Sequence, residues 1–200
     1  MSMLTTPRDI SDYLEQTAAL HKHLCPRQVL GVRMGLYGGE LLGVEVPQEG
    51  KRLFAFVEAD GCFADGVSVA SGCWLGHRTL RLVDLGKAAA TFVDTETERA
   101  VRISPHPQAR ERAALYAPDA PDRWHAQRDA YQVMPVAELL EARPVTLTLS
   151  LREIISRPGL RVPCEACGEE VMNEREMIVE GKVLCRTCAG LDRYYSDAGP

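Results

Sequence analysis

The sequence contains no apolar run that approaches the roughly 18 residues a membrane-spanning helix needs, so we expect no membrane span. Its first residues, MSMLTTPRDISDYLEQ, have no basic segment followed by an apolar stretch, which argues against a secretory signal peptide. We therefore expect a cytoplasmic protein. In that compartment cysteines stay reduced, and clusters of them indicate metal ligands or catalytic thiols.

Several familiar signatures are also missing. The chain has no G-x-G-x-x-G, Walker loop, H-E-x-x-H or G-x-S-x-G motif, and no internal repeat or low-complexity tract. It also lacks a basic excess, because its net charge is −5, which disfavours bulk binding to nucleic acid or membrane surfaces. Only five histidines and seven cysteines occur in 200 residues, so the places where they gather are the informative ones.

Four of the cysteines form two C-x-x-C pairs near the C-terminus. They are Cys164, Cys167, Cys185 and Cys188. Zn²⁺ takes four soft donors in a tetrahedron, and each C-x-x-C turn presents two sulfurs. The pairs predict a structural zinc in a treble-clef or zinc-ribbon finger over residues 159–200. We expect a hairpin between the pairs that turns at residues 180–182, and a short helix that starts at the second pair.

Residues 1–158 predict an α+β core with a mixed or antiparallel sheet and packed helices, because strands and helices alternate without a regular βαβ rhythm. Thr6 and Pro7 are typical of a helix start, and Pro26 begins a second helix after the first ends near His21. The expected strands are 51–58, 79–84, 88–94, 98–104 and 144–151; the expected helical segments are 62–72 and, interrupted by prolines, 105–143.

Glycines Gly31, Gly35 and Gly39 share one face of the second helix. A glycine stripe lowers helix stability but lets another backbone approach closely. Two interpretations follow: tight packing against the chain's own sheet or helices, or a subunit interface.

The stretch HKHLCP gathers His21, His23 and Cys25 at the end of the first helix. Cys62 follows Asp60 and Gly61 at a predicted helix start, where backbone N–H groups would lower its pKa. We expect these residues to face one core site completed by Cys62, with His23 and Cys62 as candidate ligands of a second zinc or other divalent ion.

An alternative interpretation of this region is structural. A histidine on an apolar helix face is usually a hydrogen-bonded core residue, and a buried cysteine usually packs as a small hydrophobe. Cys73 lies 11 residues after Cys62, too far along a helix for both to bind one ion, and is predicted to be a packed helix-end residue.

Together these stretches resemble a known family. HKHLCPRQVLGVRMG resembles the opening H-G-H-x-C-P-G-x-x-x-G-x-R-x-G of the formylmethanofuran dehydrogenase FmdE family. EADGCFADGVSVASGCWLGHRTLRLVDLGKAAATF resembles its second block, and the four-cysteine finger resembles one that many members carry. Lys22 and Arg27 stand where the family often has glycine, and Trp74 and His77 replace a usual Thr and Lys, which changes the size and charge of any pocket.

The resemblance implies an α+β core, a homodimer and an appended zinc finger. It carries the family's candidate site onto residues of this chain, with Cys73 and Lys87 nearby. The candidate catalytic residues are His21, His23, Cys25, Cys62, Asp65 and Lys87. Asp65, one helical turn after Cys62, is expected to orient a histidine.

Three functions remain open. The first is a metal-binding accessory protein, associated with a molybdenum or tungsten formylmethanofuran dehydrogenase but without the molybdopterin. The second is a stand-alone metal- or thiol-dependent enzyme, and the third a zinc-finger binding or regulatory module. Six glutamates make the finger acidic, which favours a protein partner over nucleic acid: Glu165, Glu169, Glu170, Glu174, Glu176 and Glu180.

Overall fold

The computed structural model describes residues 9–155, 159–191 and 193–196. The chain divides into two compact units, residues 1–147 and 148–200, and each is described by itself. The division into domains at residues 158/159 stays a prediction. None of the helices in the described ranges is long and apolar enough to span a membrane.

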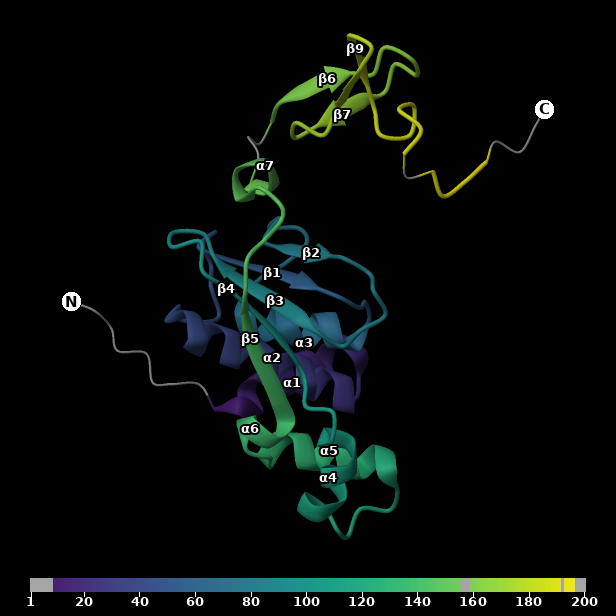
Figure 1. The fold of residues 1–200 in the computed structure, drawn as a ribbon. Helices are drawn as coiled ribbons and strands as arrows, with labels where there is room; N and C mark the ends of the chain where they lie inside the picture. The colour runs from purple at the N-terminus through teal and green to yellow at the C-terminus, as the bar shows by residue number, and fades with distance from the viewer. Residues whose placement is uncertain (1–8, 156–158, 192, 197–200) are drawn as a thin grey trace. The chain divides into compact units, whose positions relative to one another are not determined.

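The first unit contains a mixed five-stranded sheet in the order β2-β1-β3-β4-β5 (Figure 1). Its strands are β1 (Leu53–Val57), β2 (Leu80–Leu82), β3 (Ala90–Asp94), β4 (Ala100–Pro105) and β5 (Leu140–Val145). Strand β1 pairs with β2 in parallel, whereas the other neighbours are antiparallel. Every residue of β1 and β3 is buried. The expected α+β class with a mixed sheet is confirmed.

Helices pack beside this sheet and at one end of it (Figure 1). They are α1 (Ile10–His21), α2 (Pro26–Leu42), α3 (Cys62–Ser71), α4 (Ala109–Tyr116), α5 (Arg123–Val133) and α6 (Val136–Leu139). Helix α2 contacts β3 and β4, and α3 contacts β1. The expected helix start at Thr6 and Pro7 lies outside the described residues.

The predicted last strand is wrong in its position. The sequence predicts an extended segment over 144–151, but β5 covers Leu140–Val145, and α7 (Leu151–Ile155) follows in the second unit. The sequence LEARPV has weak intrinsic strand preference. Pairing with β4, from Pro105 opposite Leu140 to Ala100 opposite Val145, holds it extended. Pro144 is tolerated because β5 is an edge strand.

The glycine stripe lets α2 pack closely against α3 within the same chain. A Cβ on Gly31 would lie 2.3 Å from the Phe63 carbonyl oxygen, and a Cβ on Gly35 would lie 2.7 Å from the Ala70 Cβ. On α3, a Cβ on Gly66 would lie 2.3 Å from the Gln28 carbonyl oxygen. These contacts favour the packing interpretation, because α3 occupies this face of α2 at Gly31 and Gly35, and a Cβ on Gly39 would meet Val44 and Val46 of the same chain.

The same contacts show that α2 and α3 run in the same direction. Gln28 meets Gly66, and Gly35 meets Ala70 one to two turns further along both helices. Residue numbers therefore rise together along the interface. The N-terminal ends of the two helices consequently lie side by side.

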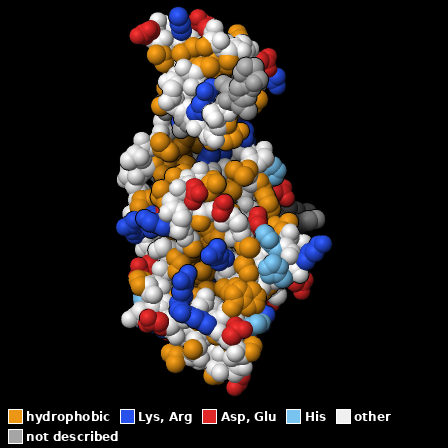
Figure 2. Space-filling model, turned by 90° about the vertical axis from the view of Figure 1, so that its right-hand side faces the viewer, with side chains coloured by type: hydrophobic (Ala, Val, Ile, Leu, Met, Phe, Trp, Pro, Cys, Tyr) orange, Lys and Arg blue, Asp and Glu red, His pale blue; other side chains and the backbone are white. Residues whose placement is uncertain are grey.

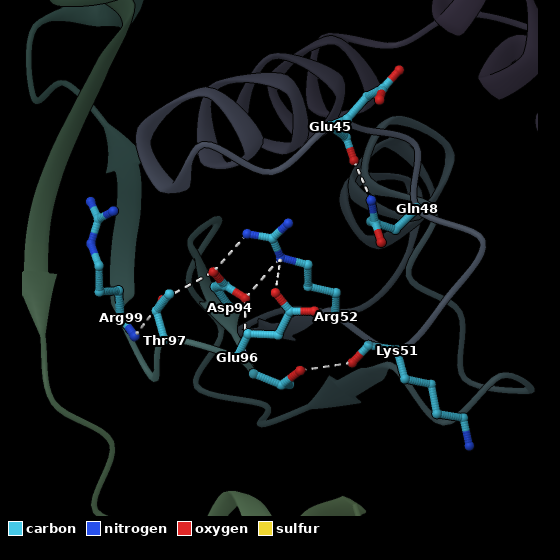
Figure 3. Close-up of polar contacts among 9 residues, drawn as sticks. Glu45, Gln48, Lys51, Arg52, Asp94, Glu96, Thr97 and Arg99 are labelled. Atoms are coloured by element: carbon cyan, nitrogen blue, oxygen red, sulfur yellow. Dashed lines mark hydrogen bonds and ion pairs between the residues drawn. The ribbon is translucent and has the colours of Figure 1, made fainter. Parts of the chain in front are cut away.

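A buried aspartate organises the turn between β3 and β4 (Figure 3). The fully buried Asp94 accepts hydrogen bonds from Arg52 Nε and Nη2, each at 3.2 Å, and from the Thr97 hydroxyl at 3.0 Å. The backbone N–H of Glu96 donates a further bond of 3.1 Å. The hydrogen bond from Arg52 is the main reason that the pKa of Asp94 lies below its usual value.

The second unit carries two small hairpins. Strand β6 (Arg161–Pro163) pairs with β7 (Glu170–Met172), and β8 (Met177–Val179) pairs with β9 (Lys182–Leu184). The predicted turn near residues 180–182 is confirmed, since Glu180 and Gly181 both have positive φ, as tight hairpin turns require.

The expected helix after the second cysteine pair is wrong. Within the described residues, 186–190 form successive turns instead. The Ala189 N–H donates to the Cys185 carbonyl, but Gly190 then adopts a left-handed conformation with φ 81°, which ends a helical turn.

Candidate functional site

The four finger cysteines come together in the second unit. The sulfur atoms of Cys164, Cys167, Cys185 and Cys188 all lie within 4.8 Å of one another. The Cys167 and Cys185 sulfurs are 4.0 Å apart, and a tetrahedron with Zn–S distances of about 2.3 Å requires sulfurs about 3.8 Å apart. The four donors therefore fit a closed zinc site, and among the described residues they are the only group of three or more donors packed this tightly.

Backbone N–H groups support ionised sulfur at this cluster. The N–H of Cys185 donates to the Cys164 sulfur at 3.2 Å, and that of Cys188 donates to the Cys185 sulfur at 3.3 Å. The hydrogen bond from the Cys185 N–H is the main cause that lowers the pKa of Cys164 to about 6. Interaction with the Cys185 and Cys167 sulfurs raises the pKa of Cys188 to about 12. A bound cation would favour the deprotonated form of all four sulfurs, since metal binding deprotonates ligating thiols.

The core site lies where the C-terminal end of α1 meets the N-terminal ends of α2 and α3. His21 is the last residue of α1, Cys25 is the N-cap of α2, and Cys62 is the first residue of α3. Figure 2 shows histidine side chains at the surface of the molecule beside hydrophobic and basic ones. HKHLCP thus contains the end of α1, and the fold also brings Cys62 of α3 to this place.

His21 connects an aspartate to a thiol. Its Nε2 lies 2.6 Å from Asp65 Oδ2, and its Nδ1 lies 3.9 Å from the Cys62 sulfur. When Nε2–H donates to Asp65, the neutral ring leaves Nδ1 as an acceptor that faces the thiol. Side-chain exposures of 29% for His21 and 35% for Asp65 leave both groups within reach of solvent. The arrangement has the order acid, base and nucleophile that thiol chemistry uses.

The expected pKa of Cys62 is not what the structure gives. The backbone N–H at the helix start does lower it, but burial raises it more. The adjacent Cys25 thiol and the charge of Asp65 raise it further, so the pKa of Cys62 lies above its usual value. A thiol of this kind needs a base to become a nucleophile, and His21 is in place to be one.

Cys25 has a role that sequence reasoning missed. Its sulfur accepts a hydrogen bond from the Gln28 N–H at 3.4 Å, while the Cys25 N–H donates to Gln28 Oε1 at 2.7 Å. This is a capping box with cysteine in place of serine or threonine. Gln28, fully buried, also donates to the Thr17 carbonyl at 2.9 Å and so joins α1 to α2. The glutamine three residues after the cap was the signal that could have found it.

The other predicted site residues lie at varying distances from this centre. His23 is exposed, and its Nδ1 bonds the His21 carbonyl at 2.9 Å, with the two rings 6.1 Å apart. Cys73 is fully buried and donates to the Leu53 carbonyl at 3.3 Å, and burial raises its pKa to about 11. It is a packed helix-end residue, as expected. Lys87 is exposed, and its backbone N–H donates to the Glu58 carbonyl at 3.1 Å.

Glu58 and Arg102 form a second polar feature that the sequence did not reveal. Glu58 follows β1, and both of its carboxylate oxygens accept from Arg102 at 2.6 Å. The hydrogen bonds from Arg102 are the main cause that lowers the pKa of Glu58, and the charge of Lys87 contributes. The two partners are 44 residues apart, so no local pattern connects them.

Comparisons with known proteins address both units. A family model described as "FmdE, Molybdenum formylmethanofuran dehydrogenase operon" matches residues 20–143. A second model, a prokaryotic dksA/traR C4-type zinc finger, matches residues 158–192. The four-cysteine cluster and this match together indicate zinc at the finger.

A curated protein and a solved structure that resemble the chain illustrate its relatives. A "Probable S-adenosyl-L-methionine-binding protein" of Archaeoglobus fulgidus is 33% identical over 199 residues, which cover 90% of this chain but 52% of the relative. The chain thus spans about half of that relative's length. A crystal structure of a tungsten formylmethanofuran dehydrogenase FmdE-like protein from Syntrophus aciditrophicus has a TM-score of 0.59. It is 22% identical, with 95% of this chain and 97% of that chain covered, and shows the shared fold.

Proposed function

Because the chain belongs to the FmdE family, we propose that it is a metal-binding accessory protein with a reactive His–Cys centre in its core. The observation that carries the reactive centre is the continuous contact from Asp65 through His21 to the Cys62 thiol, at 2.6 and 3.9 Å. Asp65 holds the imidazole in the tautomer that accepts a proton, His21 takes the proton from Cys62, and the thiolate is the nucleophile.

Alkylation of Cys62 by iodoacetamide tests this centre. The rate at Cys62, read by peptide mass spectrometry, should fall about tenfold or more in His21→Ala, because each unit by which the thiol pKa rises lowers the thiolate fraction about tenfold. Asp65→Asn should slow it less, since it removes only the orienting carboxylate. His77→Ala is the matched control, an exposed histidine outside the centre. Equal rates in wild type and His21→Ala would contradict the proposed base.

The second part of the proposal is that the zinc finger binds a protein partner, such as a molybdenum or tungsten dehydrogenase. The description of the matching family model, which names the operon of such an enzyme, supports this. The acidic finger favours a protein over nucleic acid, whose phosphates would repel it.

Size-exclusion chromatography with a purified formylmethanofuran dehydrogenase tests the partner. The wild-type chain should co-elute with it, whereas Cys185→Ser, which removes a zinc ligand, should elute alone. Thr187→Ser lies between the ligands without being one and should behave as wild type. Separate elution of the wild-type chain would rule out this partner. In the same runs, light scattering on the chain alone should give twice the mass of one chain, as the family resemblance predicts for a homodimer.

A metal ion in the core is the alternative to thiol chemistry and would make the chain a metal-dependent enzyme. Cys62 and a histidine, His21 or His23, would be its ligands, since imidazole and thiolate suit zinc. Metal analysis separates the two. One equivalent per chain supports thiol chemistry with zinc in the finger alone. Two equivalents, reduced to one in Cys62→Ala, support the core metal.

A further inference from the structure

We propose that Cys25 and Cys62 form a redox-active dithiol that exchanges with low-molecular-weight disulfides. This inference rests on the reactive centre proposed above and adds its second thiol and its class of substrate. Cys62 is the attacking thiol, and Cys25 is the one that resolves the mixed disulfide.

The packing of α2 against α3 brings the two thiols together. Gln28 contacts Gly66, and Gly31 contacts Phe63 and Val67, along two helices that run in the same direction. Three residues before Gln28 is Cys25, and four residues before Gly66 is Cys62. One turn toward the N-terminus from these contacts, the two cysteines therefore face each other across the interface. The Cys25 thiol helps to raise the pKa of Cys62, which agrees with this placement.

The two sulfurs have different surroundings, which suit them to different steps of the reaction. Cys62 is half-buried and next to His21 Nδ1, so it can both meet a small disulfide and lose its proton. Cys25 is only 7% exposed, so a disulfide in solution does not reach it first. The Gln28 N–H that points at its sulfur, at 3.4 Å, stabilises the negative charge that Cys25 carries as it attacks.

The exchange takes place in two steps. In the first step, the Cys62 proton moves to His21 Nδ1, and the Cys62 thiolate attacks one sulfur of a small disulfide R–S–S–R. This forms Cys62–S–S–R and releases R–S⁻. The released R–S⁻ then takes the proton from His21. Cys25 then gives its proton to water, and its thiolate attacks the Cys62 sulfur, which forms the Cys25–Cys62 disulfide and releases a second R–S⁻ that takes up a proton from water. The protein loses two electrons and two protons, and the small disulfide becomes two thiols. An excess of small thiol reverses both steps.

Oxidised glutathione is the probe, and the full-length zinc-loaded chain is the protein. After exposure, free thiols are blocked and unreduced peptides are mapped by mass spectrometry. We expect a Cys25–Cys62 link in wild type. In Cys25→Ser the glutathione adduct should remain on Cys62, because no resolving thiol is left. Serine preserves the cap of α2, so this variant should fold. Cys73→Ser should still form the link, because Cys73 is buried against Leu53 and outside the centre.

The outcomes separate this inference from the proposed function. A stable glutathione adduct on Cys62 of the wild-type chain, or no reaction at Cys62, would overturn the dithiol. If Cys62 alkylation still depended on His21 in that case, the reactive centre would stand and only the dithiol would fall. A link that forms at the same rate in His21→Ala would support the dithiol and remove His21 as the base; we expect that rate to fall about tenfold or more.

Discussion

Replacing Gly31 by alanine tests the packing on which the core site depends. The added Cβ would lie 2.3 Å from the Phe63 carbonyl oxygen and 2.8 Å from the Val67 backbone nitrogen, whereas ordinary Cβ contacts begin near 3.4 Å. Both obstacles are backbone atoms, so no side chain can turn aside. Relief requires α2 and α3 to move apart by about 1 Å.

The expected cost follows from two opposing terms. Overpacking typically destabilises a core by about 1–3 kcal/mol, and a clash with backbone belongs at the upper end. Alanine in place of glycine in a helix returns about 1 kcal/mol. The net loss should be about 2 kcal/mol, or a fall in Tm of about 4–8 °C for a chain of this size.

Thermal unfolding followed by circular dichroism measures this loss. Gly76→Ala is the matched control, because no heavy atom lies within 4 Å of a Cβ placed there, and its Tm should equal that of wild type. The wider helix spacing in Gly31→Ala should also slow formation of the Cys25–Cys62 link. An unchanged Tm for Gly31→Ala, with an altered association state, would refute this reasoning and favour the stripe as a subunit interface.

Three further predictions concern other parts of the chain. Cys185→Ser should remove one equivalent of zinc, measured by elemental analysis, while the core keeps its unfolding transition; unchanged metal content would contradict the ligand assignment. Asp94→Asn should destabilise the core by about 1–3 kcal/mol, because Arg52 loses its charged partner in a buried network. The folded-state pKa of Asp94 is lowered, so its contribution to the free energy of unfolding is complete above the unfolded-state pKa and is lost as pH falls through the folded-state pKa. Measured against falling pH, the free energy of unfolding of the wild type should therefore show a loss that the variant lacks. Lys22 has φ 61° at the C-terminal end of α1, so Lys22→Gly should raise Tm, because glycine adopts this conformation at lower cost; a lower Tm would show that the lysine side chain stabilises the turn.

The zinc finger is the part of the protein that the sequence determined most completely. Two C-x-x-C pairs with 17 residues between them can satisfy zinc in few ways, because local turns impose the spacing of each pair. The structure brings all four sulfurs together. The helix expected after Cys185 failed, because the left-handed Gly190 ends the turn, and glycine permits that conformation without requiring it.

The core site was only half contained in the sequence. HKHLCP placed His21 and Cys25 at a helix end, because the periodicity of α1 and Pro26 are local signals. Nothing local could show that the 2.6 Å contact of His21 is with Asp65, 44 residues away, or that Lys87 contacts Glu58. Burial also raises the pKa of Cys62, whereas the sequence predicted a lowered one, because desolvation depends on what packs around a thiol.

What the sequence determined about this protein is therefore the set of local structures: the helix ends, the strands β3 and β4, the two C-x-x-C turns and a glycine face on α2. Tertiary structure alone decided which surfaces meet. Pairing with β4 holds LEARPV extended despite its weak strand preference, and Gly31 packs against the backbone of α3. The physical reason is that backbone conformation follows from neighbouring residues, whereas contacts between distant segments follow from the packing of the whole core.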